Sequence, residues 1–231
     1  MHHHIAYRAF VRAKVACLRF AQGLDDAADE ARALAGLSHR HLVDAAVTLV
    51  LVGGLTGAGK STLAGALADR FGMVTLSSDR LRKELAGQAP EQHAPSSYQE
   101  GLYSAEWTRR TYGELLRRAE ALLGMGESVV LDASWTDRAH RAEARALATR
   151  CSADLVELRC QAPVAVTISR LAGRVGPSDA DASTAARMAQ DASPWPEATT
   201  VDTAGPLELS IRAAASALGG RQPPLSPRAR S

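Results

Sequence analysis

Apolar residues recur along the chain with two different periods. Between residues 5 and 42 they return every three or four positions, with arginine and carboxylate side chains between them, as on one face of a helix. From residue 45 onward, apolar runs of strand length alternate with longer helical patterns. That alternation is typical of a parallel sheet whose strands are joined by helices. The pattern predicts an α/β domain preceded by a pair of helices over residues 5–20 and 24–42.

Five apolar runs have the length of buried strands, and helical patterns fill the gaps between them. The clearest helical patterns cover residues 60–70, 104–123 and 137–149. The predicted strands cover residues 47–52, 73–77, 128–132, 155–160 and 199–202.

The two ends of the chain differ from its centre. Residues 1–44 form a predicted helical extension, and residues 45–218 form the predicted α/β domain. Residues 219–231, GGRQPPLSPRARS, contain glycine, proline and arginine but almost nothing to bury. We therefore expect this tail to be disordered.

Composition argues against several classes of protein. The 231 residues are 46% hydrophobic, yet no apolar run reaches the roughly 18 residues that cross a bilayer. A net charge of +2, with dispersed lysine and arginine, argues against nucleic acid as a partner. Cys17, Cys151 and Cys160 are widely spaced, which argues against a disulfide framework or a zinc site. We expect a cytoplasmic protein that does not span a membrane.

The strongest motif, GLTGAGKST, lies between the first predicted strand and the helix that follows it. Gly54, four further residues and then Gly59, Lys60 and Ser61 fit the phosphate-binding pattern G-x-x-x-x-G-K-[ST]. The glycines let backbone N–H groups point inward around a polyphosphate, which also faces the positive end of the helix. Lys60 would reach the outer phosphates, and Ser61 would ligate magnesium. The predicted nucleotide-binding residues are Gly54, Leu55, Thr56, Gly57, Ala58, Gly59, Lys60, Ser61 and Thr62.

The alternative for this motif is an ordinary glycine-rich turn with a solvated lysine. The strand before the motif and the helix after it favour the nucleotide. A triphosphate is therefore the ligand that we expect for this turn.

A second element, SSDRLR, begins where the second predicted strand ends. Ligands of parallel sheets gather beyond the carboxyl ends of the strands, so Asp79 would share a crevice with Lys60. A carboxylate there can accept the proton of a hydroxyl group. Arg82, about one helical turn further on, would hold a phosphate or the substrate. The alternative is that Asp79 caps a helix and Arg82 lies on the surface, and both roles can coexist.

The third predicted strand ends at Asp132, within VVLDASW. A phosphate-loop enzyme would place there a carboxylate that binds magnesium, directly or through water. The alternative is a helix cap, but the strong strand pattern and the metal that a phosphate loop requires favour the metal role. On the following helix we expect Arg138 and Arg141 to be solvated, unless one of them reaches the substrate.

Arg170 and Arg174 lie four residues apart on one predicted helical face and lead into VGPSDADAS, a segment rich in turn-forming residues. Phosphoryl transfer spreads negative charge over the moving group, and arginines on a closing lid can neutralise it. The alternative is an exposed basic helix. Together with the other motifs, the lid is favoured.

With these motifs, residues 45–217 resemble the small P-loop kinases related to gluconate kinase, zeta toxins, chloramphenicol phosphotransferase and polynucleotide kinase. The resemblance rests on GLTGAGKST, SSDRLR, VVLDASW and SRLAGRVGPSDADAS. It implies the P-loop NTPase fold with a five-stranded parallel sheet of order 2-3-1-4-5, ATP and Mg²⁺ as co-substrates, and Asp79 as the base. It also implies that Arg170 and Arg174 contact the phosphates.

The chain is also similar to kinase-like AAA-domain proteins that are fused behind an aminoglycoside-phosphotransferase-like domain. In this resemblance, residues 1–44 look like the last helices of the upstream domain, and a contact with such a domain is expected. The bulk of that domain is absent here, so no aminoglycoside activity is transferred to this chain.

The predicted function is that of an ATP-dependent kinase that transfers the γ-phosphate to a hydroxyl group of a small molecule. One alternative is a polynucleotide 5′-hydroxyl kinase, against which stand the dispersed basic residues and an aromatic content of only 4%. Another is an ATP-binding regulatory module that hydrolyses ATP slowly and transfers no phosphate. The preference for ATP over GTP rests on the resemblance, and the sequence indicates neither the acceptor nor the oligomeric state.

Overall fold

The computed structural model describes residues 2–89, 101–172 and 182–219. The chain divides into two compact units, Met1–Ala46 and Val47–Ser231, and each has its own packing. Most of the predicted tail, and the segment that carries Arg174, lie outside the described residues.

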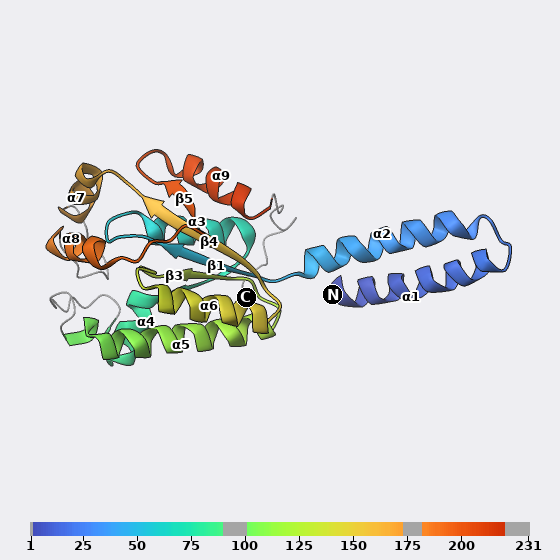
Figure 1. Cartoon of the computed structure of the whole chain (residues 1–231), viewed down its shortest axis with the longest axis horizontal. Coiled ribbons are helices and arrows are strands. Elements are labelled where there is room, and N and C mark those ends of the chain that lie inside the picture. Colours follow the sequence, from blue (N-terminus) through green and yellow to red (C-terminus); the bar gives the residue numbers. More distant parts are fainter. Residues whose placement is uncertain (1, 90–100, 173–181, 220–231) are drawn as a thin grey trace. The chain divides into compact units, whose positions relative to one another are not determined.

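The first unit is a hairpin of two helices, α1 (His2–Ala21) and α2 (Ala27–Ala45), drawn in Figure 1. Alanines pack between the helices, where the Ser38 hydroxyl donates a hydrogen bond of 2.9 Å to the carbonyl oxygen of Ala6. Near the turn, Arg19 forms an ion pair of 2.9 Å with Glu30. The buried alanines are Ala6, Ala9, Ala13, Ala16, Ala27 and Ala31.

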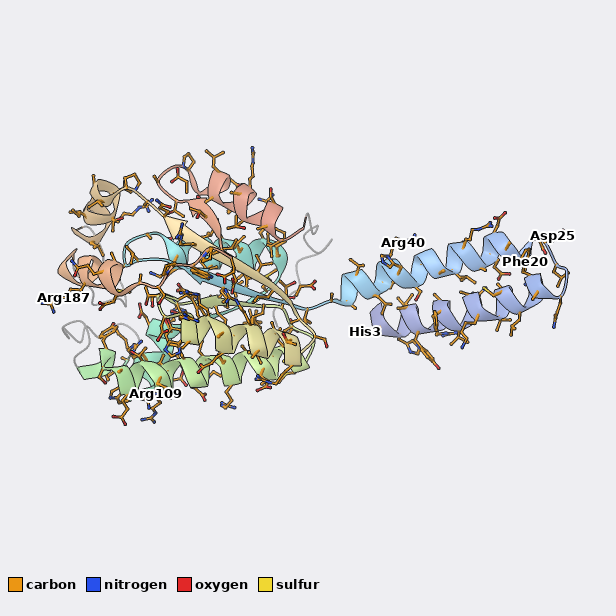
Figure 2. The ribbon with its side chains drawn as sticks, in the orientation of Figure 1. His3, Phe20, Asp25, Arg40, Arg109 and Arg187 are labelled. Carbon is orange, nitrogen blue, oxygen red and sulfur yellow. The ribbon has the colours of Figure 1, made fainter. Side chains whose placement is uncertain are left out.

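The large apolar side chains of α1 lie outside this interface. Tyr7 and Leu18 are 68% and 65% exposed, so the hairpin buries its alanines and leaves larger residues in solvent. Figure 2 shows Phe20 near the turn between the helices and His3 at the opposite end of α1. Among the helices in the described ranges, none is long and apolar enough to cross a membrane.

The second unit contains a five-stranded parallel sheet in the order β2-β3-β1-β4-β5. The strand order, the parallel pairing and the flanking helices confirm the predicted fold class. Each strand begins and ends within one residue of its predicted range. The central strands β1 and β3 are buried at every position, and such apolar runs give a strong signal in sequence. The strands are β1 (Thr48–Gly53), β2 (Val74–Ser77), β3 (Val129–Asp132), β4 (Asp154–Gln161) and β5 (Thr199–Asp202).

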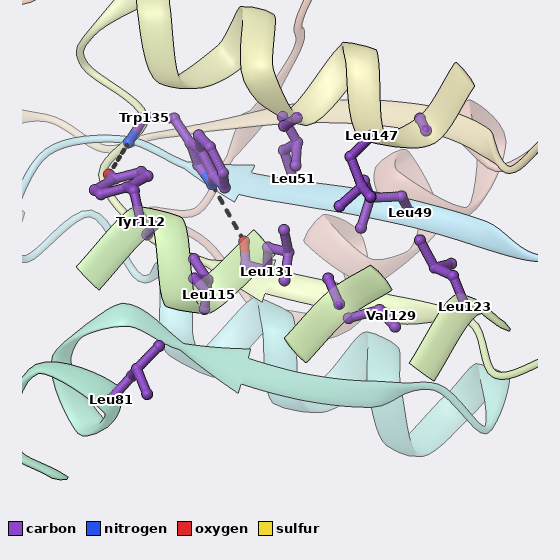
Figure 3. Close-up of a cluster of buried hydrophobic side chains, with 14 of the residues drawn as sticks. Leu49, Leu51, Leu81, Tyr112, Leu115, Leu123, Val129, Leu131, Trp135 and Leu147 are labelled. Atoms are coloured by element: carbon purple, nitrogen blue, oxygen red, sulfur yellow. Dashed lines mark hydrogen bonds between the residues drawn. The ribbon is translucent and has the colours of Figure 1, made fainter. Parts of the chain in front are cut away.

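Helices cover both faces of the sheet. Leu49 and Leu51 of β1 pack into a cluster with α5 and α6, and Figure 3 shows this cluster. Val50 and Val52 belong to the cluster on the other face, with α3 and α9, as the alternation of side chains along a strand requires. The helices of this unit are α3 (Lys60–Phe71), α4 (Ser78–Leu85), the 3₁₀ helix Gly101–Tyr103, α5 (Ala105–Gly124), α6 (Arg138–Arg150), α7 (Val164–Ala172), α8 (Ala182–Asp191) and α9 (Leu207–Ala217).

The carboxyl ends of the strands point toward α7 and α8 in Figure 1. Because all the strands are parallel, the segments that follow β1, β2 and β3 begin at the same edge of the sheet. Lys60, Asp79 and Asp132 follow or end these strands, so the topology gathers them at this edge.

Candidate active site

The predicted phosphate-binding loop, residues 54–59, joins β1 to α3 and is called the phosphate loop below. Its backbone has positive φ angles at Gly54, Gly57 and Gly59, which residues with a Cβ rarely adopt. Gly57 also lies close to α7, because a Cβ there would come 2.7 Å from Thr167 Cγ2. The sequence motif therefore has the curled backbone that phosphate binding requires.

The loop is anchored near both of its ends. Near its start, the N–H of Gly54 donates a hydrogen bond of 3.1 Å to the carbonyl oxygen of Ser134. Near its end, the Thr203 hydroxyl donates a hydrogen bond of 2.6 Å to the carbonyl oxygen of Ala58. The loop is thus tied to the segments that follow β3 and β5.

Gly53, the last residue of β1, lies between the loop and two buried tryptophans. A Cβ built on Gly53 would overlap the ring of Trp195 and lie 3.1 Å from the Cβ of Trp135. Both tryptophans are buried. The position has no room for a side chain, so the loop leaves the sheet directly beside these rings.

Lys60 and Ser61 begin α3 and lie beside Asp132, the last residue of β3. The Ser61 hydroxyl donates a hydrogen bond of 2.7 Å to Asp132 Oδ2, and Lys60 Nζ donates one of 3.0 Å to the carbonyl oxygen of Leu55. Asp132 is 5% exposed, and burial raises the pKa of its carboxyl group against the opposing effects of Lys60 and Ser61. Asp137, not Asp132, caps α6. The Ser61 and Asp132 oxygens are the type of ligand that a hard divalent cation takes.

These side chains line a cavity of about 840 Å³. The structure brings Lys60, Ser61 and Asp132 to this cavity together with Asp79 and Arg82. Asp79 is the second residue of α4 and not its N-cap residue. Other lining residues are Thr56, Tyr103, Arg109, Thr136, His140 and Met188.

Arg82 is buried, with 6% of its surface exposed, so it does not lie on the surface. Its Nη1 donates a hydrogen bond of 2.6 Å to the carbonyl oxygen of Leu102, and its guanidinium lies 4.7 Å from the centroid of the Tyr103 ring. Its Nε is buried and has no hydrogen-bond partner among the described residues. Arg82 therefore joins α4 to the segment that leads into α5, at the wall of the cavity.

Tyr112 of α5 lines the cavity and contacts the segment that follows β3. Its ring stacks on His140 at 4.1 Å and meets the edge of Trp135 at 5.1 Å. Its hydroxyl accepts a hydrogen bond of 3.2 Å from the N–H of Trp135, marked in Figure 3, and lies 3.1 Å from Ser134 Oγ. Burial raises the pKa of the Tyr112 hydroxyl, so this hydroxyl stays protonated.

Arg141 of α6 corrects one expectation from the sequence. It was expected to be solvated, but it is 2% exposed and its guanidinium binds backbone carbonyls. A signal was present in the sequence, because Arg141 precedes Ala144 and Ala148 by three and seven residues and so shares their buried helical face.

Arg170 lies at the end of α7 beside the phosphate loop and is not among the residues that line the cavity. Its Nη2 donates a hydrogen bond of 2.6 Å to the carbonyl oxygen of Thr203. A Cβ built on Gly59 would lie 3.4 Å from its Nη1, which is buried and has no hydrogen-bond partner in the described part of the chain. Arg174, its predicted companion, lies outside the described residues.

The comparison with known sequences identifies a family and close relatives. A family model described as AAA domain matches residues 49–194. Uncharacterized proteins of Mycobacterium tuberculosis and Mycobacterium bovis are 44% identical to the chain over 209 residues. The match covers 90% of this chain and 42% of each relative, so the chain spans about two-fifths of the relatives' length.

Solved structures of kinases share the fold. A gluconokinase from Sinorhizobium meliloti has a TM-score of 0.55 at 20% identity, covering 75% of this chain and 92% of that protein. A sugar kinase from Janibacter gives the same TM-score and identity, with 75% and 95% covered. The Mycobacterium tuberculosis APS kinase in complex with AMPPNP and APS also has a TM-score of 0.55 at 20% identity, with 75% and 98% covered. Similarity at this identity supports the shared fold alone.

Proposed function

We propose that this chain, which belongs to the AAA domain family, is an ATP-dependent kinase that transfers the γ-phosphate to a hydroxyl group of a small molecule. One observation carries the proposal: a single cavity is lined by Lys60, which directly follows the phosphate loop, by the bonded pair Ser61 and Asp132, and by the carboxylate of Asp79. Phosphate binding, metal binding and proton acceptance are thus available within one site.

The phosphate loop and Lys60 would hold the nucleotide. Backbone N–H groups of residues 54–59 and the start of α3 would surround the phosphates, and Lys60 would exchange its bond to Leu55 for the β- and γ-phosphates. Arg170, beside Gly59, would place a further cation against the nucleotide, with Arg174 as its proposed companion. The preference for ATP is part of the proposal.

Ser61 and Asp132 would hold Mg²⁺, directly or through water. Within the described ranges, no cluster of three histidine, cysteine, aspartate or glutamate side chains could hold a metal by itself. The oxygen ligands of Ser61 and Asp132 fit an ion that completes its coordination with phosphate oxygens and water. When bound, Mg²⁺ would neutralise charge on the transferring phosphoryl group.

Asp79 would act as the general base. As the acceptor oxygen forms its bond to the γ-phosphorus, the bond to the β-phosphate oxygen breaks and ADP leaves. The proton of the acceptor hydroxyl passes to the carboxylate of Asp79. Arg82, beside it at the cavity wall, would orient the acceptor or its phosphate.

The size and lining of the cavity favour a small acceptor. About 840 Å³ has to hold the nucleotide phosphates and the acceptor together. Beyond Lys60, the cationic side chains that line the described cavity are Arg82 and Arg109, and Arg82 is already bonded to backbone. An extended polynucleotide would call for a larger basic surface.

The test is a screen for ADP release with Mg·ATP and a panel of sugars, polyols, amino alcohols and nucleosides. A small hydroxyl compound should stimulate ADP release and appear as a phosphorylated product by mass spectrometry. A 5′-hydroxyl oligonucleotide forms a separate arm. Phosphorylation of the oligonucleotide alone, or slow ADP release that no acceptor stimulates, would refute the small-molecule proposal.

A further inference from the structure

Two segments of chain that line the cavity are joined by a side chain that does not line it. The first segment follows β3 and includes Thr136, and the second follows α8 and includes Ser193. The N–H of Ser193 donates a hydrogen bond of 2.9 Å to the carbonyl oxygen of Thr136. Arg141 of α6 bonds to both segments.

The guanidinium of Arg141 has partners in two directions. Its Nη1 donates a hydrogen bond of 2.7 Å to the carbonyl oxygen of Trp135 and a longer one of 3.2 Å to that of Thr136. Its Nη2 donates one of 2.7 Å to the carbonyl oxygen of Pro194, and the group lies 5.2 Å from the Trp195 ring centroid. A buried cation is costly unless it is hydrogen-bonded, so these contacts fix its place.

The helix before the second segment, α8, contacts the phosphate loop. Met188 of α8 lies at the cavity, and its Sδ accepts a hydrogen bond of 3.4 Å from the hydroxyl of Thr56 in the phosphate loop. Between Met188 and Pro194, whose carbonyl oxygen Arg141 binds, the chain passes through Asp191 and Ser193, which both line the cavity. A displacement of this segment would therefore change the wall that faces Thr136.

We propose that Arg141 is a positioning residue that sets the spacing between Thr136 and Ser193 and thereby the affinity for the acceptor. The proposal rests on the proposed kinase function. It assigns to Arg141 an effect on the acceptor through the two segments that contain Thr136 and Ser193. An arginine suits this role because its planar group donates to both segments at once, whereas lysine carries its three donors on a single nitrogen.

Arg145 provides a matched control on the same helix. It forms hydrogen bonds of 2.9 Å with both carboxylate oxygens of Glu157 and an ion pair of 3.1 Å with Glu197. None of these three residues lines the cavity. Glu157 also accepts a hydrogen bond of 3.2 Å from Trp195 Nε1, and lysine at position 145 keeps the positive charge beside this carboxylate. Arg145→Lys should therefore disturb the contacts of α6 and leave the acceptor walls in place.

The experiment compares Arg141→Lys with Arg145→Lys in the full chain, using the acceptor identified by the screen. Arg141→Lys should raise the acceptor KM about tenfold or more, as for the loss of one charge-assisted hydrogen bond, and leave the Kd of AMPPNP within about twofold. Arg145→Lys should change neither by more than about twofold. Arg141→Gln, which keeps one amide donor and removes the buried charge, should raise the KM as well.

Hydrogen–deuterium exchange without substrate gives a second readout. Arg141→Lys should speed exchange about tenfold in peptides that contain the N–H of Ser193, and Arg145→Lys should leave it unchanged. An unchanged acceptor KM in both Arg141 variants, or unchanged exchange at Ser193, would overturn the positioning role even if stability fell. If no acceptor is phosphorylated, the kinase proposal fails, and the exchange result still decides whether Arg141 holds the two segments.

Discussion

The Ser61 hydroxyl and the Asp132 carboxylate are joined by a hydrogen bond of 2.7 Å, although 71 positions separate them in sequence. The bond connects the first turn of α3 to the end of β3, at the point where the phosphate loop enters its helix. Burial raises the pKa of Asp132, so its ionised form is stabilised less by the folded protein than by water. A cation bound beside Asp132 would stabilise this ionised form.

The substitution Asp132→Asn should therefore raise the stability of the protein without ligand at about pH 7. Because the folded pKa is raised, the unfolded state ionises first as the pH rises above the ordinary value of 3.8. The free energy of unfolding of the natural protein should fall from there to the folded pKa and stay lower above it. Urea unfolding at several pH values should show that the advantage of the variant grows with pH and disappears below 3.8.

Asp69, an exposed residue of α3, supplies the control for the loss of a carboxylate. Asp69→Asn should change the free energy of unfolding by no more than about 0.5 kcal/mol. An advantage of Asp132→Asn that is equal at all pH values would show that the substitution acts through packing and not through ionisation.

Replacement of Lys60 by alanine should weaken nucleotide binding about 10- to 100-fold, because it removes a charge-assisted hydrogen bond to a phosphate. Calorimetry with AMPPNP and Mg²⁺ measures the effect. Lys14→Ala on α1 is the matched control. This variant should bind AMPPNP with the same affinity as the natural protein. Equal affinities for both variants would remove Lys60 from the nucleotide site.

Asp79→Asn should lower the rate of phosphoryl transfer about 10²- to 10⁴-fold, the usual contribution of a general base. The affinity for AMPPNP should change by less than about twofold, since Asp79 is assigned to the acceptor. Single-turnover kinetics separate the two effects. A transfer rate close to that of the natural protein would exclude Asp79 as the base.

Trp135→Ala should destabilise the protein by about 3–5 kcal/mol, because the side chain is fully buried and its ring contacts Tyr112. Trp107, whose ring lies 5.0 Å from the Arg110 guanidinium, is only partly buried, and Trp107→Ala should cost about 1 kcal/mol. Urea unfolding followed by circular dichroism compares the two. An equal loss in the free energy of unfolding for both variants would show that Trp135 stabilises the second unit no more than Trp107 does.

Local pattern was sufficient to predict the sheet and the phosphate loop. Strands buried on both faces appear as apolar runs, and the backbone of residues 54–59 is determined by its glycines. The position of Asp79 and Asp132 followed from topology, because parallel strands end at one edge. The strands and the loop depend on residues that are neighbours in sequence, and the positions of the two aspartates depend on the general rule for parallel sheets.

The tertiary contacts of Tyr112, Trp135 and Arg141 could not be predicted in the same way. Trp135 has a φ of 53°, which no glycine signals, and its N–H bonds to a hydroxyl 23 residues earlier. The partners of Arg141 include the carbonyl of Pro194, 53 residues later, and backbone carbonyls carry no mark in a sequence. Such contacts depend on tertiary geometry. Without knowledge of these partners, the sequence predicts that Arg141 is solvated.

The lack of space at Gly53 links three positions that are far apart in the chain. A methyl group there would collide with the ring of Trp195 and crowd the Cβ of Trp135, so a larger residue at position 53 demands a smaller one at position 195 in the same molecule. Evolution or protein design can therefore enlarge position 53 only together with a change at position 195.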